Sequence, residues 1–105
     1  MNIIVHTKNP KTLFNAINNK IEKKELKTWE IRENTRDQVL YNHTPEQWSN
    51  AALVKPLNHE KGLELRIAWW DENEPEEAIK GYILGRFTEI LMVHFRNYFD
   101  FLETR

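Results

Sequence analysis

The sequence predicts a single α+β domain spanning residues 1–105, with an antiparallel-rich sheet of about five strands and two long helices on one sheet face. Three observations lead to this prediction. Two pairs of short apolar segments are each joined by turn residues, an amphipathic segment follows the first strand, and a long apolar helix occupies the C-terminal third. Strands joined as hairpins are antiparallel, and helices at both ends of such a run are typical of the α+β class. The predicted order is strand, helix, strand, strand, short helix, strand, strand, helix.

The N-terminal part contains a strand and a helix. Residues 2–7 include three consecutive β-branched residues, which favour a buried strand. Asn9 and Pro10 then supply a cap and a proline at the first helical position. The following residues 10–24 place Leu13, Ile17 and Ile21 on one face, so we expect an amphipathic helix lying on the sheet.

Two hairpins follow. Residues 28–33 and 38–43 alternate in polarity around turn residues 34–37, with Trp29 and Tyr41 on the apolar side. Thr44 and Pro45, with Gln47 completing a capping box, predict a helix of one or two turns before residue 51. Residues 51–57 and 63–70 then predict a second hairpin around a loop at 58–62, with Pro56 at an edge or a strand end.

Residues 73–105 are predicted to form one long helix whose apolar surface is wider than the single stripe that a core-facing helix needs. One stripe contains Ile79, Ile83, Phe87, Ile90, His94 and Phe101. A second contains Leu84, Leu91, Phe95, Tyr98 and Leu102, and Met92, Val93 and Phe99 widen the pair. We expect one stripe to cover the sheet and the other to form a homodimer. The residues predicted at the dimer interface are Phe87, Leu91, Phe95, Tyr98, Phe99 and Leu102.

Gly81 and Gly85 add a G-x-x-x-G spacing to this helix. Each glycine costs a helix about 1 kcal/mol relative to alanine, so a close approach of another group should offset the cost. Two interpretations follow: the glycines pack against the chain's own sheet, or a partner helix or ligand approaches them. Charged neighbours such as Lys80 and Arg86 argue against the membrane version of this motif.

The charges are balanced overall but unevenly distributed. The net charge is −1, which argues against nucleic-acid binding because phosphate neutralisation needs a basic surface. Lysines crowd the first helix and its exit at positions 11, 20, 23, 24 and 27, and carboxylates crowd positions 71, 72, 74, 76 and 77. Helix-dipole complementarity and solvation account for both groups. Alternatively, the two groups meet across a subunit contact and steer association.

Composition limits the remaining classes. The 40% hydrophobic and 30% charged fractions are those of an ordinary globular domain. The absence of cysteine, of an evident signal peptide and of an apolar run long enough to cross a bilayer leads us to expect a cytoplasmic protein without a membrane partner. No known catalytic motif or metal-ligand spacing is present, so the sequence predicts no metal and no cofactor.

Two groups of residues are candidates for function beyond the dimer. His43 and His94, with Glu89 one turn back on the helix, would form an acid–base site if they converged on one cleft. A structural role is the alternative for each histidine. Trp70 should lie on the sheet face opposite the helices, beside Arg66, and an exposed aromatic next to an arginine is typical of a protein contact surface. The alternative is that the chain's own loops cover Trp70.

The sequence therefore predicts a small protein-interaction module, such as an adaptor, an inhibitor or an accessory subunit, that is homodimeric through its last helix. Enzymatic activity is the less favoured interpretation. The alternative is a small-ligand binder or acid–base enzyme with an apolar pocket between the sheet and the long helix.

Overall fold

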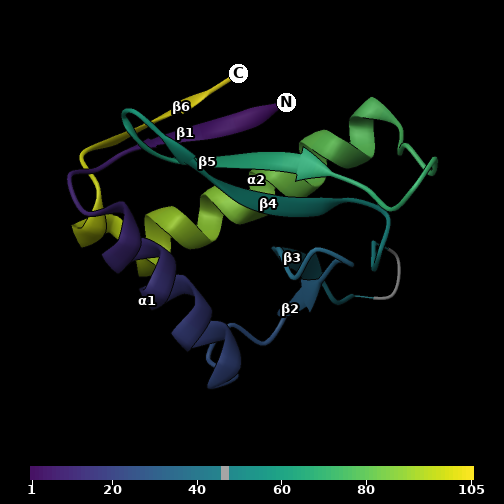
Figure 1. Ribbon diagram of the computed structural model, residues 1–105, viewed down its shortest axis with the longest axis horizontal. Coiled ribbons are helices and arrows are strands. Elements are labelled where there is room, and N and C mark those ends of the chain that lie inside the picture. Colours follow the sequence, from purple (N-terminus) through teal and green to yellow (C-terminus); the bar gives the residue numbers. More distant parts are fainter. Residues whose placement is uncertain (46–47) are drawn as a thin grey trace.

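A computed structural model describes residues 1–45 and 48–105, and it confirms the α+β class with an antiparallel sheet (Figure 1). Within these residues the sheet has six strands in the order β2-β3-β4-β5-β1-β6, one more than expected. The elements are β1 (Asn2–His6), α1 (Pro10–Glu22), β2 (Trp29–Glu33), β3 (Val39–His43), β4 (Leu53–His59), β5 (Gly62–Ala68), α2 (Glu77–His94), a 3₁₀ turn η1 (Arg96–Tyr98) and β6 (Phe101–Thr104).

The prediction of one helix over residues 73–105 is wrong at both ends. Helix α2 begins at Glu77, because Pro75 disfavours helical backbone at the residue before it and Glu76 is extended. The helix ends at His94, and after η1 the chain returns as β6. Strand β6 pairs antiparallel with β1, placing Leu102 opposite Val5. The apolar residues at the end of the chain therefore belong to a strand and a turn as well as to a helix.

The predicted short helix is not present in the described part of its segment. Residues 48–51 form turns, and the backbone N–H of Ala51 donates to the Trp48 carbonyl at 3.1 Å. Asn50, with φ of 61°, lies in the left-handed region, which asparagine tolerates better than most residues. The predicted capping-box partner Gln47 lies outside the described residues.

The core lies between the sheet and the two long helices, which both cover the same face as predicted. Alternate residues of β1, including Ile3 and Val5, meet Leu65 of β5 on this face, and Ile83 and Phe87 of α2 pack onto them. All five side chains are fully removed from solvent or nearly so. Side-chain alternation explains the pattern, because successive residues of a strand point to opposite faces.

The opposite sheet face carries polar and charged side chains. Glu64 on β5 accepts hydrogen bonds from Asn2 at 2.8 Å and from Arg66 at 2.9 Å. Burial alone would raise the pKa of Glu64, but these two hydrogen bonds outweigh it and hold the pKa below its usual value. Ile4 and Leu53 are also buried on this face, so long side chains and loops cover much of it and Arg66 is among its exposed groups.

Candidate functional site

The side chains predicted to form a dimer lie mainly inside the single chain. Phe87, Leu91 and Phe95 are fully buried, and Phe99 is buried as well. The Phe87 ring stacks on Tyr41 of β3 with 5.3 Å between ring centres. Most of both apolar stripes of α2 is therefore buried within the single chain, and Met92, Val93 and His94 are exposed. Tyr98 and Leu102, the other two predicted contacts, keep partial exposure, but η1 and β6 carry them rather than α2.

The two glycines of α2 lie on the outer side of the helix. Both are exposed, and a Cβ built at either position would find no described atom within 4 Å outside the helix's own neighbouring backbone. The interpretation that they pack against the chain's own sheet is therefore wrong. The glycines leave a shallow groove that Tyr82, Arg86 and Glu89 border. Nothing within the described chain offsets the cost of two glycines at these helical positions.

A cleft of about 320 Å³ adjoins this groove, between α2 and the ends of β2 and β3. The cleft and the groove share Tyr82, Arg86 and Glu89, so these three side chains border both. The cleft is lined by Thr28 and Trp29 at the start of β2, His43 and Pro45 at the end of β3, and Tyr82, Arg86, Glu89 and Ile90 on α2. Half of this lining is aromatic or aliphatic and half is polar or charged, so the cleft is more polar than most small-molecule sites.

His43 is the unusual residue of the cleft. Its side chain is 5% exposed, and its Nδ1 is buried without a hydrogen-bond partner in the described structure. The ring lies between Trp29, at 4.8 Å, and Tyr82, at 6.2 Å between ring centres. Burial and the positive charge of Arg86 lower the pKa of His43, so the imidazole is neutral at pH 7. An unsatisfied buried nitrogen costs about 1–3 kcal/mol and requires an explanation.

Arg86 brings a positive charge to the mouth of the cleft. Its guanidinium lies 5.1 Å from the centre of the Tyr82 ring and 3.6 Å from Glu89 Oε1. The Arg86 and Glu89 side chains are both about half exposed or more, and their separation is long for a hydrogen bond. This pair is therefore a weak one, and the N–H groups of Arg86 can turn to a bound group.

The structure brings together two of the three residues predicted as an acid–base group. His43 and Glu89 line the same cleft, whereas His94 lies on the exposed end of α2 with its ring beside Phe95. Sequence reasoning missed the part that Tyr82 and Arg86 play. Their spacing in the sequence could have indicated this part. Arg86 follows Tyr82 by four residues, so both lie on one side of the helix, and Arg86 interrupts an otherwise apolar stretch.

The other two histidines are satisfied locally. His6 stacks on Phe101 with 3.9 Å between ring centres and forms a hydrogen-bonded pair with Glu103. This pairing holds the pKa of Glu103 below its usual value. His59 accepts a hydrogen bond from the backbone N–H of Lys61 at 3.0 Å. The His6 contact joins β1 to β6, and the His59 contact lies within the turn between β4 and β5.

Trp70 and Arg66 do not form a joint patch. Trp70 is half-buried, and its indole N–H points to Asn50 Oδ1 at 3.4 Å, so a loop of the chain covers part of it. Arg66 is exposed on β5 and bonds to Glu64. Trp70 instead lines a separate hollow of about 250 Å³ with Leu40 and Lys55. The open sheet face near Arg66 is accessible, but it is polar rather than aromatic.

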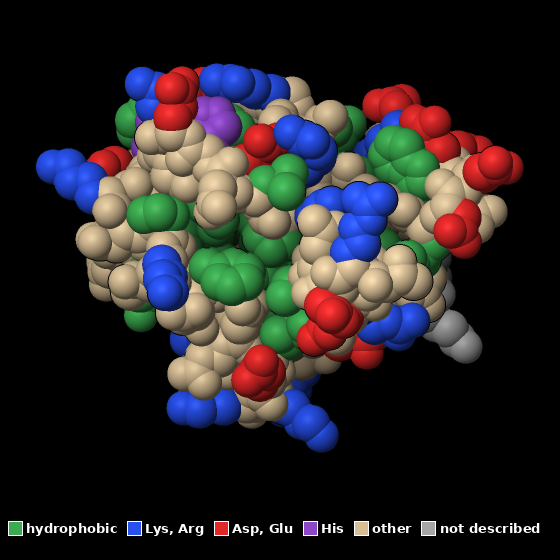
Figure 2. Space-filling view, in the orientation of Figure 1, with side chains coloured by type: hydrophobic (Ala, Val, Ile, Leu, Met, Phe, Trp, Pro, Cys, Tyr) green, Lys and Arg blue, Asp and Glu red, His purple; other side chains and the backbone are tan. Residues whose placement is uncertain are grey.

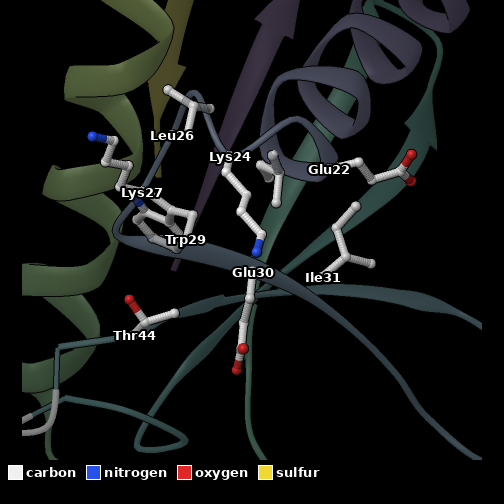
Figure 3. A pocket seen from close by; sticks show the side chains of 9 residues that line it. Glu22, Lys24, Leu26, Lys27, Trp29, Glu30, Ile31 and Thr44 are labelled. Atoms are coloured by element: carbon white, nitrogen blue, oxygen red, sulfur yellow. The ribbon is translucent and has the colours of Figure 1, made fainter.

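A larger depression, about 500 Å³, lies at the free edge of β2. Its floor is apolar, with Leu26, Trp29 and Ile31, and Figure 3 shows the Lys24 side chain extending across it toward Glu30. Lys24 follows α1 with φ of 60°. The charged side chains around this depression include both lysines and glutamates. Among the described residues, no buried polar atom without a hydrogen-bond partner lies in its wall. The cleft at His43 is therefore the stronger candidate for a binding site.

Two further properties bear on the site. Among residues 1–45 and 48–105, no cluster of three or more His, Cys, Asp or Glu side chains is placed to hold a metal ion. No helix in the same residues is long and apolar enough to cross a membrane. Comparison with known protein families, curated proteins and solved structures found no match, so the cleft and the groove are interpreted from their own geometry.

Proposed function

We propose that this chain is a small protein-interaction module that pairs with a second copy through the outer face of α2. The observation that supports the proposal is the open groove at Gly81 and Gly85. Two glycines inside a helix cost about 2 kcal/mol together relative to alanine, and no described group of the same chain benefits from the space they leave. A helix of another subunit can approach such a groove closely, because no side chain stands between the two backbones.

An antiparallel arrangement of two α2 helices fits the residues of this face. If Gly85 of one copy lies against Gly85 of the other, Met92 of one copy meets Ala78 of the other, since each is seven residues from Gly85. Met92 is 49% exposed and Val93 is 68% exposed. Near the C-terminal end of α2, apolar side chains therefore project beyond the glycine groove. The two shapes are complementary only when the helices run in opposite directions.

The charges favour the same arrangement. Figure 2 shows acidic side chains gathered at the end of the molecule where α2 begins, and Asp71, Glu72 and Glu76 belong to this group. At the other end of α2 lies Arg96, and Lys20 of α1 lies 5.8 Å from the Phe95 ring. Antiparallel helices bring the acidic end of one copy to the basic end of the other, and their dipoles also align favourably. A parallel pair would oppose like charges.

The expected dimer is weak. Burying Met92 and Val93 in each copy contributes about 1.5–3 kcal/mol for a side chain that starts fully exposed, and less for these two. Association itself costs at least about 4 kcal/mol. We therefore expect a dissociation constant in the micromolar range or weaker, and a dimer that forms and separates with concentration. Such behaviour suits an adaptor, inhibitor or accessory subunit in the cytoplasm whose open sheet face, with Arg66, stays free for another protein.

The test is the solution mass by size-exclusion chromatography with light scattering, from micromolar to millimolar protein. We expect the average mass to rise from that of the 12.7 kDa monomer toward twice that value. Gly85→Leu should abolish the rise, since its Cβ starts in open space on the outer face of α2 and the rest of the side chain occupies the groove. Asn15→Leu adds the same side chain to an exposed position of α1 and should leave the rise unchanged. A monomer at every concentration, or an unchanged rise in Gly85→Leu, would contradict the proposal.

A further inference from the structure

The cleft at His43 has the features of a site for a small organic carboxylate, and we infer that it binds a singly charged one with a flat apolar body. The inference does not depend on the proposed dimer, because residues of one chain supply all the groups involved. It rests on three properties of the cleft: a buried ring nitrogen without a partner, one half-exposed guanidinium, and aromatic and aliphatic side chains that make up half of the lining.

The volume and walls limit the size of the ligand. About 320 Å³ lies at the lower end of the range for small-molecule pockets. The ring centres of Trp29 and Tyr82 lie 4.8 Å and 6.2 Å from that of His43, and Ile90 adds an aliphatic side chain to the lining. These surfaces favour a flat ligand of roughly ten non-hydrogen atoms over a long chain or a nucleotide.

The charges select a monoanion. Arg86 is the cation of the cleft lining, and its planar guanidinium presents parallel N–H groups that match the two oxygens of a carboxylate. The neutral His43 ring adds no second positive charge. Glu89, 3.6 Å from Arg86, would repel a doubly charged phosphate more strongly than a carboxylate. A carboxylate can replace Glu89 at Arg86, because the existing pair is long and exposed.

A role in ligand binding would explain why a histidine occupies this buried position. A buried imidazole without a partner is destabilising, and an apolar residue at this position would avoid that cost. The small exposed part of the ring faces the cleft that His43 lines. Nδ1 itself is removed from solvent, so a ligand in the cleft reaches it only when the ring turns, and the turned ring gains the hydrogen bond that the described chain does not supply.

Benzoate is a suitable probe, with benzamide as its neutral counterpart and inorganic phosphate as the competing anion. Binding is followed by NMR chemical shifts of the Trp29 indole N–H and the His43 ring. A fragment of this size should bind with a dissociation constant of about 1–10 mM. We expect saturable shifts with benzoate, and binding of benzamide and phosphate weakened about tenfold or more. Arg86→Gln should weaken benzoate binding by a similar factor, and Arg86→Lys by less, since it keeps the charge.

Arg36→Gln is the matched control, since it removes one positive charge from an exposed turn outside the cleft, and it should bind benzoate normally. Absence of any shift at about 10 mM benzoate would overturn the inference. So would equal binding of benzoate and benzamide, or unchanged binding by a folded Arg86→Gln variant. Tighter binding of phosphate than of benzoate would reject the carboxylate as the ligand.

Discussion

Arg86 on α2 faces the ring of His43 on β3 across a single cleft, although the two residues are far apart in the sequence. Burial lowers the pKa of His43, and the positive charge of Arg86 lowers it further. Glu89, on the same side of α2, is the opposite charge that borders this cleft. Because the pKa of His43 is lowered in the folded protein, the free energy of unfolding should depend on pH through this residue.

Stability should fall as the pH drops below about 6.5, the ordinary pKa of histidine. The unfolded chain binds a proton at His43 in this range while the folded chain resists it, so protonation favours unfolding. One such group contributes a slope of at most about 1.4 kcal/mol per pH unit. Urea denaturation between pH 7.5 and 5 would measure it. In His43→Gln this part of the slope should disappear, whereas His94→Gln, at an exposed position, should retain it.

The same substitution should act in opposite directions at two glycines. Gly62 has φ of +145°, and an added Cβ would lie 2.4 Å from the Val5 carbonyl oxygen, so Gly62→Ala should cost about 2–4 kcal/mol. Gly85 has open space, so Gly85→Ala should stabilise the monomer by about 0.5–1 kcal/mol. Thermal and urea unfolding of both variants provide the measurement. Equal effects of the two substitutions would contradict the described surroundings of these glycines.

Neighbouring residues of α2 should respond differently to a charge. Leu91 is fully buried, so Leu91→Asp should destabilise the fold by about 3–5 kcal/mol or more, since it buries a charge without a partner. Met92 is on the outer face, so Met92→Asp should leave the circular dichroism and unfolding midpoint nearly unchanged at low concentration. At high concentration it should keep the protein monomeric. A folded, stable Leu91→Asp variant would show that α2 faces the core with a different side.

The pairing of β6 can be tested with proline. Asn2 and Arg105 exchange both backbone hydrogen bonds, so the N–H of Glu103 points to β1 and that of Thr104 points outward. Glu103→Pro should therefore cost about 1–3 kcal/mol, and Thr104→Pro less than about 0.5 kcal/mol. Glu103→Gln separates the loss of the His6 contact from the loss of the backbone bond. Equal costs for the two prolines would place β6 in another register.

Local patterns predicted most of the fold correctly because they report directly on backbone preferences. The alternation in β2, β3 and β5 and the spacing of Leu13 and Ile17 each follow the period of one element. Strand β6 was missed because its few residues do not show a pattern of their own. Phe95, Phe99 and Leu102 are spaced as in a helix, no glycine or proline interrupts them, and the strand forms because β1 offers a free edge.

The site was predicted only in part for a related reason. The sequence brought His43 and Glu89 into one hypothesis, and the structure places both at one cleft. The contribution of Arg86 depends on how α2 crosses the ends of β2 and β3, which a single sequence does not determine. The position of Gly85 on the outside of α2 depends on the same rotation.

The placement of β1 has a consequence for how the chain folds. Although β1 is made first, its two neighbours in the sheet are β5 and β6, which come from the second half of the chain. During synthesis, β1 stays unpaired until residues from position 62 onward are available, although α1 can already pack against β2. Contacts of this long sequence separation slow folding, because a large loop must close before they form. The sheet therefore closes late, around the strand that precedes the other five described strands in the sequence.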